Sequence, residues 1–225
     1  MHFAHGPLLC CGSGRSATDA HTAELYPGDS REIFNLNELI EAFSLERVGK
    51  SGAKFDPDKT KWFNQQYLRA KSNTELASLL NNNQKIDADN SFIEGVVNLM
   101  KERASFIDEL LADDYFFNAP ENYDEKTLKK KWKDNTSSNM KILKQKLISL
   151  NSFDAETIEQ GFKDFLDENN LGMGAALPNF RLLVTGKGMG PSMFQIAALL
   201  GKEEVLSRFD SGLSRISTIK EETSL

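Results

Sequence analysis

The stretch LPNFRLLVTGKGMGPSMFQIAALLGKEEVLSRF, Leu177 to Phe209, joins an arginine, a glycine-rich turn and an amphipathic segment that begins at a proline. The turn, Gly186 to Gly190, holds glycines that can adopt positive φ, and Pro191 suits the first position of a helix. Apolar residues then recur at helical spacing: Met193, Ile196, Ala197 and Leu200. The pattern predicts a helix start and Arg181 presented to a polar ligand, with an ordinary corner between two helices as the alternative.

The rest of the chain also shows helical rather than strand periodicity. Asn35 is a plausible N-cap for one apolar stripe, and further helical segments run from Lys59 to Lys71 and, with a break near Asn135 to Asn139, from Lys126 to Leu150. The longest stripe covers about five turns and comprises Phe92, Val96, Met100, Ala104, Ile107 and Leu111. No alternating strand pattern of useful length occurs. An all-α helical bundle in two subdomains is therefore predicted, with a seam near Asn151.

Composition limits the class of protein. The chain has 225 residues, 40% of them hydrophobic and 27% charged, with a formal net charge of −6. This length is enough for one core or two small ones. The apolar run from Gly6 to Cys11 is too short for a signal peptide. Because the only cysteines are the adjacent pair Cys10 and Cys11, we expect no disulfide and a cytoplasmic location.

Two blocks together resemble one family. Besides Leu177 to Phe209, the block REIFNLNELIEAFSLERVGKSGAKFDPDKTKWFNQQYLR, Arg31 to Arg69, is similar to bacterial-type glutamyl-tRNA synthetases, in the segment that follows their class I catalytic core. The order and separation of the blocks also match. The resemblance runs from about Pro27 to Phe209 and implies the stem-contact and anticodon-binding portion of these enzymes.

This resemblance divides the chain into five parts. Residues 1–26 are an unmatched leader that we expect to be disordered, and residues 27–90 are the end of a stem-contact-like region. Residues 91–150 and 151–212 are the first and second helical anticodon-binding subdomains. Residues 213–225 are expected to form a frayed tail, because no apolar periodicity follows Arg215.

No catalytic residue is predicted. The family uses ATP and Mg²⁺ in a core with an HIGH-type and a KMSKS-type motif, and neither motif occurs here. Only about 26 residues precede the first matching block, whereas such a core needs on the order of 150. His2 and His5 lack the strand and helix that surround the HIGH motif. We therefore expect no cofactor or metal ligand in this chain and no ligase activity from it alone.

Five residues are candidates for tRNA anticodon binding: Arg103, Arg181, Gly190, Pro191 and Met193. The resemblance implies that Arg181 reads an anticodon base and that Arg103 stacks on another. The planar guanidinium suits both tasks, because it can bond a base edge at two points or lie flat on a base. The alternative for Arg103 is a surface ion pair with Glu102 or Asp108.

The partner implied by the resemblance is tRNA(Glu), and we expect a monomer that binds neither membrane nor DNA. A net charge of −6 opposes phosphate binding, but the segment Lys126 to Lys146 has eight lysines and one acid, Asp134. That segment is either an RNA-facing surface or simply a solvated helix face. The sequence GKGMG lacks the features of a nucleotide-binding loop. The alternative function is a non-catalytic, helical protein-interaction module.

Overall fold

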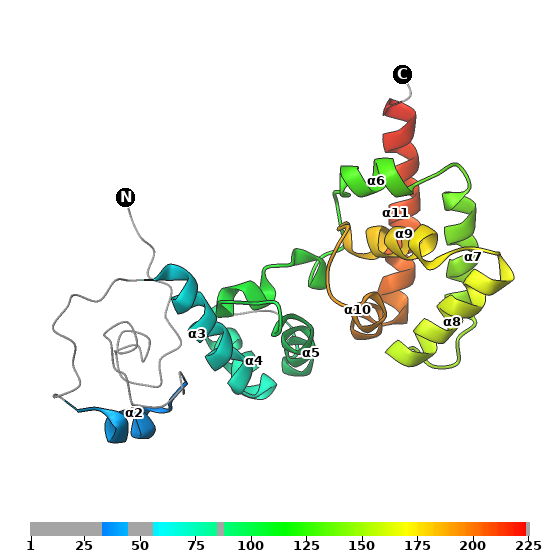
Figure 1. The fold of residues 1–225 in the computed structure, drawn as a ribbon. Coiled ribbons are helices and arrows are strands. Elements are labelled where there is room, and N and C mark those ends of the chain that lie inside the picture. The colour runs from blue at the N-terminus through cyan, green and yellow to red at the C-terminus, as the bar shows by residue number, and fades with distance from the viewer. Residues whose placement is uncertain (1–32, 45–55, 85–87, 224–225) are drawn as a thin grey trace. The chain divides into compact units, whose positions relative to one another are not determined.

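The computed structural model describes residues 33–44, 56–84 and 88–223, and within these ranges it contains helices and no strand (Figure 1). The all-α prediction is confirmed for this part of the chain. The predicted leader, residues 1–26, lies outside it. Across the same ranges, no helix has both the length and the apolar character needed to cross a bilayer. The described residues divide into two compact units, the first ending at Leu110 and the second beginning at Leu111.

The first unit is built from α2 (Leu36–Ala42), α3 (Pro57–Ala70), α4 (Asn73–Gln84) and α5 (Asn90–Met100). Asn35 caps α2 as predicted. Its Oδ1 accepts from the Glu38 N–H at 3.0 Å, and the Glu38 carboxylate accepts from the Asn35 N–H at 2.7 Å. This reciprocal pair is a capping box. Asp56 caps α3 in a similar position, so that helix starts slightly before the predicted Lys59.

The long helical stripe predicted from Phe92 to Leu111 is not one helix. α5 ends at Met100, whose carbonyl accepts from the N–H groups of both Arg103 and Ala104 at 2.8 and 3.0 Å. A short 3₁₀ helix, η2 (Ile107–Leu111), follows. The chain leaves the helix because α3 holds Glu102: Arg69 donates to its carbonyl at 2.8 Å and forms an ion pair with its carboxylate at 3.0 Å. Ala104 and Ile107 are nevertheless buried, as the stripe predicted.

The second unit contains the 3₁₀ helix η3 (Asp114–Phe116) and six α-helices: α6 (Glu125–Lys131), α7 (Thr136–Ile148), α8 (Ala155–Glu168), α9 (Met173–Thr185), α10 (Met193–Leu200) and α11 (Lys202–Thr223). α7 packs on α8, α9 and α11, so the seam predicted near Asn151 falls inside this unit. The core is rich in phenylalanine, and Phe162 on α8 lies within ring-stacking range of Phe180 on α9. The subdomain boundaries proposed from the sequence stay predictions.

The frayed tail predicted for residues 213–225 is wrong for most of that segment. α11 continues as a helix to Thr223. Leu213 and Ile216 are buried and extend the stripe begun by Val205 and Phe209, at intervals of three and four residues. Polar residues between these positions hide the periodicity in the sequence, but the packed helix face continues past Arg215.

Candidate nucleic-acid interface

Arg181 lies on α9, a helix that contains a proline in its interior. Pro178 has no N–H to donate to the carbonyl of Gly174, four residues earlier. That carbonyl accepts instead from the Lys131 ammonium at 3.1 Å. Asn179 reinforces the same junction, donating to the carbonyls of Ala175 at 2.7 Å and Lys131 at 3.3 Å. These contacts fix α9 against the end of α6 and so hold Arg181 in a defined position.

Arg181 is half-buried as a residue, Nη1 of its guanidinium is buried, and the group is fixed at one end. Its Nη2 donates to the Pro191 carbonyl at 2.7 Å. A Cβ atom at position 190 would lie 2.9 Å from Arg181 Nη1 and 3.5 Å from the Tyr115 hydroxyl. A side chain at position 190 would therefore displace the Arg181 guanidinium, whereas its distance to Tyr115 is ordinary van der Waals contact. The structure brings Arg181, Gly190 and Pro191 together, with Tyr115 beside them.

The glycine turn is shaped by contact with the segment before α6. Gly186 has φ of 70°, in the left-handed region that favours glycine, and its N–H donates to the Leu182 carbonyl at 2.8 Å to close α9. A Cβ at Gly186 would lie 2.4 Å from the Asn122 carbonyl, and one at Gly188 would lie 2.2 Å from the Thr127 hydroxyl. The turn is thus held against residues 120–127.

Two features of the predicted helix start need correction. α10 begins at Met193 with Ser192 at the N-cap, so Pro191 lies before the cap rather than at the first helical position. Pro191 is buried and acts through its carbonyl, which holds Arg181. The Met193 side chain is also buried, packed into the core of the unit, whereas Met189 at the tip of the turn is 86% exposed.

Arg103 lies on the turn after α5, in the first unit, and is exposed. We predicted that its guanidinium would emerge at the border of a helix, but Arg103 lies on the turn that follows the helix. Glu102, considered as its ion-pair partner, is engaged by Arg69. The other four candidates belong to the second unit: Arg181, Gly190, Pro191 and Met193. Arg103 belongs to the first unit and is therefore considered apart from them.

Sequence reasoning missed Arg208, a buried arginine whose hydrogen bonds hold Tyr115 and the end of α9. Its side chain is 2% exposed. Nη1 donates to the carbonyls of Tyr115 at 2.6 Å and Val184 at 2.9 Å, and Nε pairs with Glu204 at 2.7 Å. Arg208 thereby joins η3, the end of α9 and α11. The spacing of Glu204 and Arg208, one helical turn apart, was the only signal in the sequence.

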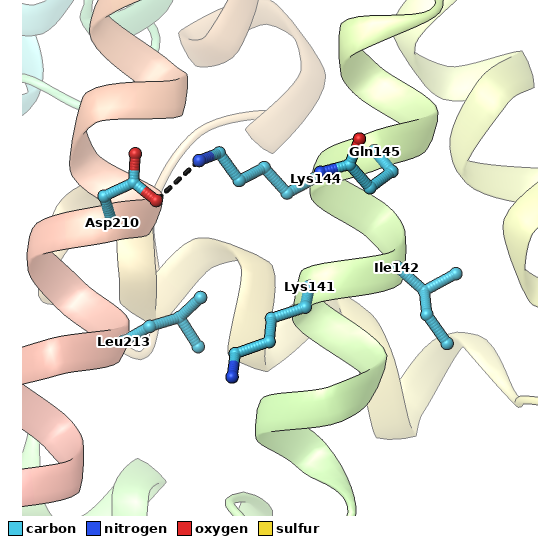
Figure 2. A pocket seen from close by; sticks show the side chains of 6 residues that line it. All are labelled: Lys141, Ile142, Lys144, Gln145, Asp210 and Leu213. Carbon is cyan, nitrogen blue, oxygen red and sulfur yellow. Dashed lines mark hydrogen bonds and ion pairs between the residues drawn. The ribbon is translucent and has the colours of Figure 1, made fainter.

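The lysine-rich segment from Lys126 to Lys146 is only partly available to a ligand. Lys129 pairs with Glu125, Lys144 with Asp210 and Lys146 with Glu168, at 3.1, 2.5 and 2.6 Å. Figure 2 shows Lys144 reaching from α7 to Asp210 on α11, across a hollow of about 510 Å³ that Lys141 and Leu213 also line. Much of the positive charge in this segment is therefore neutralised by ion pairs within the second unit. The exposed lysines that remain are Lys126, Lys130, Lys133 and Lys141.

Asp124 links the glycine turn to α6 and gives a prediction on pH. Its N–H donates to the Gly186 carbonyl at 2.8 Å, and its Oδ1 accepts from the Thr127 N–H at 2.7 Å as the N-cap of α6. Hydrogen bonds from Thr127 hold the pKa of Asp124 below its ordinary value of 3.8. The cap therefore stabilises the folded state above pH 3.8, and its contribution falls as the pH drops through the lower, folded-state pKa.

We accordingly expect Asp124→Ala to lower the free energy of unfolding by about 1 kcal/mol at neutral pH. The difference from the unsubstituted chain should shrink below pH 3.8. Urea unfolding between pH 3 and 7 measures both effects. Asp124→Asn is the matched control, because asparagine caps helices well but does not titrate here. A deficit of Asp124→Ala that stays constant down to pH 3 would contradict this account.

Comparison with known proteins identifies the class. The chain belongs to the anticodon binding domain family, whose model matches residues 64–213. It is 42% identical over 193 residues to a glutamate–tRNA ligase of Flavobacterium psychrophilum, covering 84% of this chain and 38% of that relative. Against the glutamate–tRNA ligase of Phocaeicola vulgatus it is 42% identical over 186 residues, or 81% of this chain and 37% of the relative. The chain thus spans well under half the length of these curated relatives.

Solved structures agree. A glutamate tRNA ligase from Elizabethkingia meningosepticum, in complex with its amino acid, matches with a TM-score of 0.79 and 34% identity, over 84% of this chain and 38% of that chain. A glutamate–tRNA synthetase from Elizabethkingia anophelis matches with a TM-score of 0.78 and 31% identity, over 87% and 40%. The resemblance drawn from the two sequence blocks is confirmed.

Proposed function

We propose that this chain binds the anticodon of tRNA(Glu), as the RNA-recognition part of a cytoplasmic glutamate–tRNA ligase, and that it does so as a monomer. The carrying observation is the fixed guanidinium of Arg181 beside the bare backbone of Gly190, inside the region that matches the family. In such a ligase ATP and Mg²⁺ would serve the glutamylation reaction. Among the described side chains, no group of three or more His, Cys, Asp and Glu that could hold a metal ion occurs.

The geometry suits the reading of an unstacked base. Because Nη2 is held by the Pro191 carbonyl, the plane of the Arg181 fork is set before RNA arrives. Glycine at position 190 leaves the fork in place, because a Cβ there would press on Nη1, which is itself buried. A base edge would therefore bind the exposed part of this half-buried side chain. Single-stranded loops are read in this way, by hydrogen bonds to base edges and by stacking. The exposed Met189 adds apolar surface at the rim. Arg103, exposed on the first unit, is proposed separately to stack on a base of the RNA.

Arg181→Ala tests this proposal. We expect it to weaken binding of a tRNA(Glu) transcript by roughly 10- to 100-fold, since a good two-point contact to a base is worth about 1–3 kcal/mol. Binding of a transcript with a substituted anticodon should change little. Fluorescence anisotropy with labelled transcripts at fixed salt measures both affinities. Arg181→Lys keeps the charge but not the fork and should lose nearly as much as alanine. Unchanged binding of tRNA(Glu) by Arg181→Ala would overturn the proposal.

Arg103→Ala is tested in the same assay but on its own, because Arg103 belongs to the other unit. We expect a loss of about 1–3 kcal/mol in binding free energy, the usual value of one stacked base. Arg103→Lys should recover little of it, since an ammonium cannot lie flat on a base. Full recovery by lysine would show that Arg103 supplies only charge and would contradict the stacking role.

A further inference from the structure

A second hollow has Tyr115, the neighbour of Gly190, in its wall. It has a volume of about 640 Å³ and is lined by three elements of the second unit: the η3 segment, the turn after α9, and α11. This volume falls within the range of small-ligand sites. Its walls include Tyr115, Asn118, Glu121, Thr185, Lys187 and Arg215. No residue of this hollow was predicted as part of a site from the sequence.

Two cations reach the hollow from different elements. Lys187, on the glycine turn, is exposed, and its positive charge also acts on the Asp124 carboxylate. Arg215, on α11, donates from Nη1 to the Glu121 carbonyl at 3.2 Å. That bond fixes the guanidinium at the wall, and an arginine has five N–H donors in all. A phosphate between the two cations would receive bonds from both.

The hollow is also lined by carboxylates and side-chain amides, which favour a nucleotide over a bare anion as its ligand. Asn118 donates to the Asp114 carboxylate at 2.7 Å, and both side chains line the hollow. The carboxylates of Asp114 and Glu121 would repel an isolated phosphate ion. They can accept hydrogen bonds from a base amino group, as carboxylates do from cytosine N4. A nucleotide carries both a phosphate, which the cations can bind, and a base, whose amino group the carboxylates can bind.

The hollow and the site of the proposed function share Tyr115 as a neighbour. Tyr115 lines it, and the Tyr115 hydroxyl lies 3.5 Å from where a Cβ on Gly190 would be. Thr185, another wall residue, is one turn after Arg181 and donates to its carbonyl at 2.8 Å. We propose that this hollow binds one nucleotide of the RNA strand next to the base at Arg181, with its phosphate on Lys187 and Arg215. This inference rests on the proposed function.

The salt dependence of binding tests the phosphate contact. The double variant Lys187→Gln with Arg215→Gln should bind tRNA(Glu) about tenfold more weakly. It should also reduce the slope of log K against log[KCl] by about 0.7–1, the value of one neutralised phosphate. The loss should be equal for the transcript with a substituted anticodon, unlike the loss in Arg181→Ala. Lys163→Gln on α8, outside the hollow, is the control and should leave the slope unchanged. An unchanged slope in the double variant would overturn the inference while leaving the proposed function intact.

A second measurement separates RNA from free nucleotide. Cytidine 5′-monophosphate, titrated into the full chain, should shift the amide NMR signals of Asn118, Lys187 and Ser211, and inorganic phosphate should do so far more weakly. Equal shifts by inorganic phosphate would overturn the nucleotide assignment. If the chain did not bind tRNA(Glu), the proposed function would fail, yet shifts with cytidine monophosphate would still support a nucleotide site. A chain that bound neither would overturn both.

Discussion

Replacing Phe162 with alanine is expected to lower the free energy of unfolding of the second unit by about 3–5 kcal/mol. Phe162 is fully buried at the centre of an aromatic cluster. Its ring centroid lies 5.5 Å from that of Phe194, 5.8 Å from Phe180 and 6.0 Å from Phe165. These rings come from α8, α9 and α10. The alanine variant would lose the transfer free energy of the ring and leave a cavity that three helices border.

The two tryptophans allow this loss to be measured in one unit. Trp62 belongs to the first unit and the buried Trp132 to the second, so a Trp62→Phe background reports urea unfolding of the second unit alone. Ile142→Ala on α7 is the control: its side chain is 45% exposed, and we expect a loss of under about 1 kcal/mol. A loss below about 1.5 kcal/mol for Phe162→Ala would show that the cluster repacks, contrary to this prediction.

Helix faces were predictable from the sequence where burial alone decides them. The apolar residues of α8 recur at helical spacing, and Phe162, Phe165 and Leu166 are all buried. The end of α5 at Met100 was not predictable, because the contact that stops it comes from Arg69, more than 30 residues earlier. The apolar stripe from Phe92 to Leu111 predicted correctly that Ala104 and Ile107 are buried. It did not predict that the backbone leaves the helix after Met100. Periodicity reports a face, whereas tertiary contacts determine where a helix ends.

The candidate site shows the same division. Arg181 and the glycine turn are close in sequence, so their neighbourhood could be predicted from one short block. The role of Pro191 could not, because its carbonyl, rather than its ring, holds the guanidinium. Arg208 could not either, since its acceptors are the carbonyls of Tyr115 and Val184, at sequence separations of 93 and 24. A backbone carbonyl has no signature in a sequence, so buried cations of this kind become visible only in the fold.

Arg208→Ala is the second substitution from which we expect a large effect, a loss of about 3–5 kcal/mol in the free energy of unfolding. It removes the donors of two carbonyls and leaves a cavity where the side chain was. Glu204 accounts for little of the loss, because its side chain is 43% exposed and can be solvated. Glu204→Ala should therefore cost under about 1 kcal/mol.

Two further variants separate the causes at this position. Arg208→Met fills most of the volume but leaves both carbonyls without their donor, so it should still lose about 2 kcal/mol or more. Arg208→Lys keeps the charge, but its single ammonium cannot reproduce the fork between Tyr115, Val184 and Glu204. Urea unfolding in the Trp62→Phe background measures each variant. If Arg208→Met were as stable as the unsubstituted chain, packing rather than hydrogen bonding would be the role of this arginine. If methionine and lysine both fall well short, the guanidinium fork joins η3 to α9, and Tyr115 depends on it for its place beside Gly190.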